Sequence, residues 1–229
     1  MKIFSITCTR DPNLTFVGRG LVRTLSSCGV QVKFLSNQTS IFDAYKKGLA
    51  SCDAADEDII ILCHDDLQLI GDKAEFIAAL SLCIKKETGI VGPAGTTFLG
   101  KEAVWWDHER WQAGYHRGQV QHRNEVNGRT EIHSTNYGPY GQVVALDGLF
   151  LAARKEVWDT IGLEKPNYFE GNWDFYDIHY TTTAHLLGYK NYAVPLHVIH
   201  QSAGILVGRD SWHNNRKAFI ENTELPLTC

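Results

Sequence analysis

Apolar and polar residues alternate in blocks along the first part of the chain, and the blocks have the lengths of strands and helices. Residues 2–8 and 30–35 are rich in residues that favour strands, and residues 17–27 between them have the period of a helix. Residues 58–63 form a continuous apolar run, which is the pattern of a strand buried on both faces. A short strand is predicted at residues 89–91.

Two capping patterns mark further helices. Ser40 and Asp43 have the spacing of a capping box, and so do Asp72 and Glu75, which predicts a helix over residues 73–86. Four apolar side chains of this last helix are expected to face the core: Phe76, Ile77, Leu80 and Ile84. The alternation of strands and helices predicts an α/β fold, with a mostly parallel sheet that helices cover on both faces.

The middle of the chain has a different character. Residues 92–140 are rich in Gly, Trp, Tyr and His and show no sustained period. A structureless segment of this length is uncommon in a compact domain and is often functional. The pattern becomes regular again with an apolar strand at 142–151, helices at 154–161 and 174–187, and a strand at 192–199.

The composition is that of a folded globular protein. Of the 229 residues, 44% are hydrophobic and 21% are charged, which allows one sizeable core. The 26 acidic residues outnumber the 22 basic ones, and this balance argues against nucleic-acid binding, which needs clustered Lys and Arg. Because no linker-like segment interrupts the chain, we expect a single domain over residues 1–229.

The cysteines and the apolar runs indicate where in the cell the protein is expected to be. None of the six cysteines belongs to a C-x-x-C pair, so the sequence indicates buried free thiols rather than a zinc knuckle or a redox pair. Free thiols favour a reducing, cytoplasmic location. The N-terminus lacks an apolar segment of signal-peptide length, and no apolar run is long enough for a membrane span.

Two adjacent acids directly follow the buried strand. Asp65 and Asp66 come after His64 at the carboxyl end of this strand, the edge at which open α/β sheets bind ligands. Neighbouring carboxylates repel each other unless a cation or hydrogen-bond donors compensate, and oxygen ligands suit Mg²⁺ or Mn²⁺. The alternative is a turn in which the Asp side chains accept backbone hydrogen bonds.

Two later segments also carry acids among apolar residues. Asp147 interrupts a predicted strand, and Gly148 after it permits the close approach of a ligand, although a simple strand end explains the pair equally well. Asp174 and Asp177 are neighbours on one face of a predicted helix. A carboxylate that faces a pocket can act as a general base, whereas both residues can also stabilise a helix start, Asp174 as the N-cap.

The late histidines and the absent motifs narrow the class of protein. His197 and His200 point to opposite faces of a strand, so one of them suits a metal or phosphate site, with a structural histidine as the alternative. The chain has no H-E-x-x-H pair, no G-x-G-x-x-G after the first strand, no Walker loop and no G-x-S-x-G elbow. These absences argue against a zinc protease, a dinucleotide enzyme, a P-loop nucleotidase and an α/β-hydrolase.

Six segments occur in an order that is known from one family. They are Ser40-Ile41-Phe42-Asp43-Ala44-Tyr45, Leu62-Cys63-His64-Asp65-Asp66, Leu146-Asp147-Gly148-Leu149-Phe150-Leu151, Phe175-Tyr176-Asp177-Ile178, Gly188-Tyr189-Lys190 and His200-Gln201-Ser202-Ala203-Gly204. Over about residues 1–205 the chain resembles the family 2 type of glycosyltransferases, in particular their short glycosyltransferase-like branch. The resemblance implies the GT-A fold, a Rossmann-like three-layer sandwich, with a nucleotide-binding part at about 1–92, an acceptor and catalytic part at 93–205 and a tail at 206–229.

The resemblance implies a metal-dependent enzyme that moves a sugar from a nucleotide-diphosphate sugar to a hydroxyl of a carbohydrate or glycoconjugate acceptor. Asp66 would hold Mn²⁺ or Mg²⁺ against the diphosphate, and His200 would complete the metal site. Asp65 would contact the ribose of the donor. Three residues after the first two strands would border the nucleoside: Thr7, Arg10 and Asn37.

The resemblance also assigns an acceptor side. Asp147 and Gly148 would lie under the donor sugar, and Asp177 matches the position of the base that takes the acceptor proton, with Asp174 as a second catalytic candidate. Direct displacement by the acceptor hydroxyl would invert the anomeric centre. The faces of four aromatic residues suit sugar rings, with a small satellite core as the alternative: Trp105, Trp106, Trp111 and Tyr115. We therefore expect Asp66, Asp147, Asp177 and His200 to converge on one cleft.

Two positions depart from the branch. His179 stands where an acid is usual in this branch, and Lys46 stands where Asn is usual. These departures leave room for a specificity or an activity that differs from that of the branch. Two other functions stay open at this stage: a non-catalytic carbohydrate- or nucleotide-binding module on the same fold, and a metal-dependent phosphohydrolase.

Overall fold

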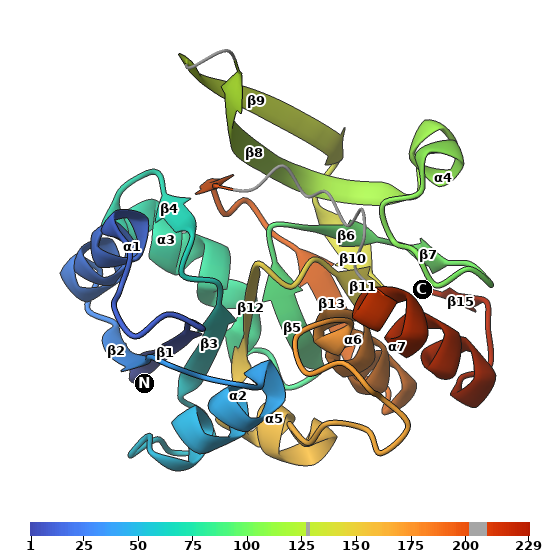
Figure 1. The fold of residues 1–229 in the computed structure, drawn as a ribbon, viewed down its shortest axis with the longest axis horizontal. Helices are drawn as coiled ribbons and strands as arrows, with labels where there is room; N and C mark the ends of the chain where they lie inside the picture. Colours follow the sequence, from blue (N-terminus) through green and yellow to red (C-terminus); the bar gives the residue numbers. More distant parts are fainter. Residues whose placement is uncertain (127–128, 202–209) are drawn as a thin grey trace.

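A seven-stranded sheet forms the centre of the molecule (Figure 1). The computed structural model describes residues 1–126, 129–201 and 210–229. The strands follow the order β10 (Gly141–Val143), β13 (Lys190–Ala193), β5 (Thr88–Gly92), β12 (Phe150–Arg154), β3 (Ile59–Cys63), β1 (Ile3–Cys8) and β2 (Gln31–Leu35). Strands β1, β2, β3, β5 and β13 run in one direction, and β10 and β12 run in the other. The α/β fold is therefore confirmed, with a mixed sheet that is mostly parallel.

The first half of the chain follows the predicted elements closely. Helices α1 (Phe16–Ser27) and α2 (Ile41–Ala50) begin as expected, and the Ser40 hydroxyl accepts a hydrogen bond from the Asp43 backbone N–H at 3.2 Å. A complete capping box opens α3 (Lys73–Leu80). The predicted helix over 73–86 is too long, because a 3₁₀ turn (Ser81–Ile84) replaces its last part and leaves Ile84 60% exposed.

A second, six-stranded sheet accounts for most of the segment without a period. Its strands are β11 (Ala145–Leu146), β6 (Ala94–Thr96), β8 (His116–Val126), β14 (Val198–His200) and β4 (Leu67–Leu69), with β9 (Arg129–Gly138) paired to β8. Strands β8 and β9 form a long antiparallel ribbon that extends from the body (Figure 1). Helix α4 (His108–Gln112) and the small pair of β7 (Phe98–Leu99) and β15 (Leu227–Thr228) complete this region.

Three predicted elements differ in the structure. The apolar run at 142–151 divides into β10, β11 and the start of β12, which belong to two sheets, and the run at 192–199 divides in the same way between β13 and β14. Helix α5 (Lys155–Ile161) is as predicted. Helix α6 (Tyr176–Leu186) begins later than expected, because its N-cap is Phe175 with φ 70°, so the interpretation of Asp174 as the N-cap is wrong.

Aromatic contacts tie the helices to the sheet. Phe42 of α2 contacts Tyr180 of α6 with ring centroids 5.9 Å apart, and Trp158 of α5 donates a hydrogen bond to the Ile60 carbonyl in β3. All six cysteines are free thiols. Four of them are buried: Cys8, Cys28, Cys63 and Cys83. Among the described residues, no helix is both long and apolar enough to cross a membrane.

Helix α7 (Asp210–Asn222) fastens the loop that precedes α6. The Asn215 side chain, which is fully buried, accepts a hydrogen bond from the Gly171 N–H at 2.9 Å and donates to the carbonyls of Gly171 and Asp174. The Ser211 hydroxyl donates to the Asp174 carboxylate. The C-terminal helix therefore fixes the backbone that leads into Asp177.

Candidate active site

The register of the central sheet brings two acidic segments to one edge. Antiparallel pairing places Phe150 opposite Cys63, so the residues before β12 lie beside those after β3. The His64 N–H donates to the Leu149 carbonyl at 3.0 Å and closes this junction. Asp147 and Gly148 therefore reach the carboxyl edge of β1 and β3, where ligands of α/β sheets bind.

The second sheet supplies the late histidine. Strand β14 pairs antiparallel with β4, which places His200 opposite Leu67, and the Gln201 N–H donates to the Asp66 carbonyl at 2.9 Å. His200 consequently lies beside Asp66, although the two are far apart in sequence. His197 lies before β14 and is exposed.

A cavity of about 780 Å³ opens at this edge. The structure brings eight of the ten predicted site residues to its wall: Arg10, Asp65, Asp66, Asp147, Gly148, Asp174, Asp177 and His200. Thr7 is fully buried, and its hydroxyl contacts the Cys63 thiol at 3.1 Å instead of the cavity. Asn37, which has φ 54°, is exposed and also lies outside the cavity lining.

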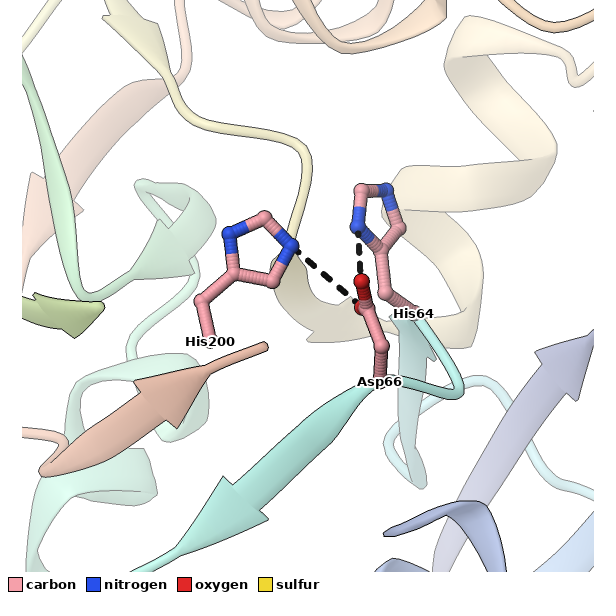
Figure 2. Close-up of side chains that lie close together, drawn as sticks. All are labelled: His64, Asp66 and His200. Atoms are coloured by element: carbon pink, nitrogen blue, oxygen red, sulfur yellow. Dashed lines mark ion pairs between the residues drawn. The ribbon is translucent and has the colours of Figure 1, made fainter. Parts of the chain in front are cut away.

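Two imidazoles flank one carboxylate oxygen in this cavity (Figure 2). Asp66 Oδ1 lies 3.3 Å from His200 Nε2 and 3.7 Å from His64 Nδ1. The three side chains can each offer a ligand atom within 4.8 Å of the other two. Asp66 Oδ1 and His200 Nε2 are buried, and neither makes a well-formed hydrogen bond within the described part of the chain. Because buried polar atoms without a hydrogen bond are costly, the convergence of Asp66 Oδ1 and His200 Nε2 fits a divalent cation.

The charges in this group are balanced internally. Burial raises the pKa of Asp66, but the two imidazoles outweigh burial and hold that pKa at about 2. Burial lowers the pKa of His200, and Asp66 more than compensates, so the pKa of His200 lies above its ordinary value. Burial lowers the pKa of His64. Asp66 is therefore an anion near neutral pH, as a metal ligand must be.

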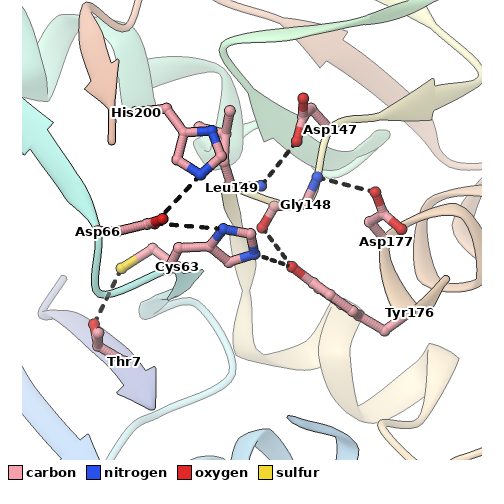
Figure 3. Close-up of polar contacts among 10 residues, drawn as sticks. Thr7, Cys63, Asp66, Asp147, Gly148, Leu149, Tyr176, Asp177 and His200 are labelled. Carbon is pink, nitrogen blue, oxygen red and sulfur yellow. Dashed lines mark hydrogen bonds and ion pairs between the residues drawn. The ribbon is translucent and has the colours of Figure 1, made fainter. Parts of the chain in front are cut away.

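Tyr176 is hydrogen-bonded to Gly148 (Figure 3), and its hydroxyl also holds the His64 imidazole in one orientation. The Tyr176 hydroxyl donates to the Gly148 carbonyl at 2.9 Å, so its oxygen accepts the hydrogen bond from His64 Nε2 at 2.6 Å. This network assigns the proton of neutral His64 to Nε2 and leaves the lone pair on Nδ1, the nitrogen that faces Asp66. Such outer partners commonly orient the imidazole ligands of metals.

Asp177 lies across Gly148 from this network. Its Oδ2 accepts a hydrogen bond from the Gly148 N–H at 3.2 Å, and Asp147 Oδ1 accepts one from the Leu149 N–H at 3.2 Å. Burial, followed by the nearby charge of Asp147, raises the pKa of Asp177 to about 7. A Cβ at Gly148 would come within 2.4 Å of the Tyr176 hydroxyl, so only glycine fits between these groups.

The resemblance places His64 in the metal motif His64-Asp65-Asp66 without a role of its own, and it gives Tyr176 no role. His64 lies directly at the end of β3, which was a usable signal, whereas the place of Tyr176 depends on how α6 meets the sheet. The two positions that depart from the branch lie outside the cavity lining. Lys46 forms an ion pair with Glu164 at 2.8 Å, and the His179 ring packs on Phe169.

The chain matches the glycosyltransferase-like family over residues 15–223 and therefore belongs to this family. Among curated proteins, none matches this chain. A solved structure of GalNAc-T7 with UDP, GalNAc and Mn2+ is similar, with a TM-score of 0.53 and 13% identity over 87% of this chain and 38% of that one. A197 from STIV has a TM-score of 0.46 and 12% identity, over 88% and 86% of the two chains. The likeness to GalNAc-T7 shows a GT-A fold.

Replacing Tyr176 by phenylalanine should weaken Mn²⁺ binding about tenfold or more, which is the usual effect of removing an outer partner of a metal ligand. The change removes the hydroxyl that orients His64 and leaves the Gly148 carbonyl without its donor. Titration of Mn²⁺ followed by electron paramagnetic resonance measures the affinity, with Tyr140→Phe outside the cavity as the control. Equal affinity in both variants would show that Tyr176 does not position His64.

Proposed function

We propose that this protein transfers a sugar from a nucleotide-diphosphate sugar to a hydroxyl of a carbohydrate acceptor, with inversion at the anomeric carbon. One observation carries the proposal: the group of His64, Asp66 and His200 and the carboxylate of Asp177 line the same cavity at the carboxyl edge of the sheet. Membership of a glycosyltransferase-like family supports the same reaction class.

On the donor side, His64, Asp66 and His200 would hold a divalent cation. When bound, the cation neutralises the negative charge that grows on the departing diphosphate. Two imidazole nitrogens with one carboxylate favour Mn²⁺ over Mg²⁺, which prefers oxygen ligands. The similar fold of GalNAc-T7, whose solved structure contains UDP, GalNAc and Mn2+, supports this choice. Asp65 and Arg10, which follow β3 and β1, are the proposed contacts to the nucleoside.

On the acceptor side, Asp177 is the proposed base. A carboxylate with a pKa near 7 takes a proton from an acceptor hydroxyl more readily than an ordinary one, and the pKa of Asp177 is raised to about 7. Gly148 holds the carboxylate through its N–H and, having no side chain, lets Tyr176 and Asp177 pack closely against its backbone. Asp174 accepts a hydrogen bond from Ser211 and is 5% exposed, so we keep Asp177 as the base.

A thermal-shift screen tests the donor half of the proposal. Nucleoside diphosphates and their sugars should raise the unfolding temperature only with Mn²⁺, because a ligand at a hundred times its Kd stabilises the folded state by about 2.7 kcal/mol. For a chain of this size we expect a rise of roughly 5–10 °C. If none of the nucleotides raised the unfolding temperature, either with or without Mn²⁺, the proposal would be contradicted.

Product analysis separates the proposed reaction from the two other functions. Incubation of the bound nucleotide-sugar with Mn²⁺ should release the intact nucleoside diphosphate, as transfer to a sugar acceptor or to water requires. Release of inorganic phosphate or of a nucleoside monophosphate would instead indicate a phosphohydrolase. Binding without any turnover over a panel of sugar acceptors would indicate a binding module.

A further inference from the structure

One wall of the cavity is aromatic, and none of its residues has a role in the proposed transfer reaction. It is formed by Trp105, Trp106, Trp111, Tyr137 and Trp212, which we call the tryptophan wall. Trp106 and Trp111 are each 38% exposed, although indole rings are usually more deeply buried. An exposed aromatic patch inside a large cavity that several acidic side chains also line is typical of a ligand site.

The wall is rigid, because its rings pack on one another. Trp106 lies against Trp212 with ring centroids 5.5 Å apart, and Trp105 and Trp111 both contact Tyr137 at 5.3 and 5.8 Å. These residues come from the loop before α4, from α4 itself, from β9 and from α7. Trp105 and Trp212 are buried and support the exposed faces. A ligand would therefore meet a surface that is already ordered.

The wall adjoins the proposed base. Trp212 packs on Phe175 at 5.6 Å, and Phe175 lies two residues before Asp177 with a φ of 70°. A non-glycine residue in this conformation is strained and is held in place by its surroundings. Phe219 of α7 contacts the same ring at 5.3 Å. The packing that builds the wall thus also fixes the start of α6, which carries Asp177.

The charge of the cavity limits what can bind to this wall. Six carboxylates line the cavity: Asp11, Asp65, Asp66, Asp147, Asp174 and Asp177. Among the described lining residues, Arg10 is the only Lys or Arg, and its guanidinium lies 4.4 Å above the Trp173 ring. The proposed cation balances part of this negative charge on the side of His200, and a donor diphosphate adds negative charge of its own. A carboxylated, sulfated or phosphorylated ligand on the wall would meet uncompensated negative charge.

We propose that the tryptophan wall is the acceptor subsite and that it binds an uncharged sugar ring of a glycan. The apolar face of the ring would lie on Trp106, and a free hydroxyl of the sugar would face Asp177. The word acceptor rests on the proposed function, whereas the binding of an uncharged glycan does not. The five wall residues thereby determine the class of acceptor, and the cation group determines the class of donor.

A glycan array without nucleotide or metal tests the wall directly. The array carries neutral, carboxylated, sulfated and phosphorylated glycans, and the full-length protein is applied as wild type, Trp106→Ala, Trp106→Phe and Tyr140→Ala. Tyr140 is the matched control, because it is also 38% exposed but lies outside the cavity lining. We expect binding to neutral glycans, a loss of tenfold or more in Trp106→Ala, partial retention in Trp106→Phe and less than a twofold change in Tyr140→Ala.

Three results would overturn the proposal: no neutral glycan bound, equal binding by wild type and Trp106→Ala, or a preference for acidic glycans. Because the array contains no nucleotide and no Mn²⁺, its result is independent of the thermal-shift screen. If neutral glycans bound but no nucleotide raised the unfolding temperature, the glycan subsite would stand and the proposed transfer function would be rejected. If a nucleotide raised the unfolding temperature but no glycan bound, the donor half of the transfer function would stand and the glycan subsite would be rejected.

Discussion

Replacement of Asp177 by asparagine should slow sugar transfer severely and at the same time make the folded protein more stable above pH 7. Loss of a general base lowers the rate by about 10²–10⁴-fold. Asparagine has nearly the same shape as aspartate, and its side-chain oxygen can still accept the hydrogen bond from the Gly148 N–H. The effect on the rate is therefore an effect of the missing proton acceptor rather than of a distorted site.

The gain in stability follows from the sign of the pKa shift. Burial and the charge of Asp147 raise the pKa of Asp177 from 3.8 to about 7, so the folded state keeps a proton that the unfolded state has already released. Stability that is present below pH 4 is lost as the pH rises to about 7. At 1.36 kcal/mol per unit, the penalty above pH 7 is at most about 4 kcal/mol, and we expect about 1–2 kcal/mol because the carboxylate is partly exposed.

Two measurements on the metal-free and metal-loaded protein check this prediction. Thermal unfolding of the metal-free protein at pH 8 should show Asp177→Asn above wild type by roughly 3–6 °C, and the difference should vanish at pH 4. Transfer by wild type should fall as the pH drops below the pKa of Asp177, which a bound cation would lower. Asp53→Asn, at an exposed position paired with Lys2, is the control for both assays. Full activity of Asp177→Asn would remove this residue as the base.

Replacement of Asp66 by asparagine should abolish Mn²⁺ binding and lower transfer by about a thousandfold, because a bound metal contributes several kcal/mol of charge stabilisation in the transition state. The change removes the only carboxylate among the three described side chains of the cation group and leaves two neutral nitrogen ligands. It also removes the anion that raises the pKa of His200, so protonation of His200 becomes less favourable. With the cation lost, nothing in the group compensates the charge of a departing diphosphate.

This second prediction is distinct from the first at the level of binding. Asp66→Asn should lose the Mn²⁺-dependent nucleotide shift, whereas Asp177→Asn should keep it, because Asp177 is not part of the cation group. Asp159→Asn, which is on α5 and pairs with Lys155, is the control for charge removal away from the cavity. If Asp66→Asn bound Mn²⁺ as tightly as wild type, the cation would have to lie elsewhere.

Local patterns predicted the first half of the fold because each of its elements is recorded within a short stretch of sequence. The run Ile59–Cys63 is apolar since it is buried on both faces, and the cap at Asp72 is formed by neighbours in sequence. The ribbon of β8 and β9 left no such record, because β9 is mostly exposed and no apolar period is needed. The apolar run at 142–151 looked like one strand because its residues are apolar throughout. In the structure its parts belong to two different sheets, and both sheets bury them.

The sequence by itself determined which chemistry is available: acids after a buried strand, an acid near the start of a helix, and a late histidine in an order typical of one family. Only the tertiary structure decided which of these groups act together. His200 reaches Asp66 through the pairing of β14 with β4, and His64 receives its orientation from Tyr176 of α6. Both contacts join segments far apart in the chain, and such pairing depends on the packing of whole sheets and helices, which short-range patterns do not encode.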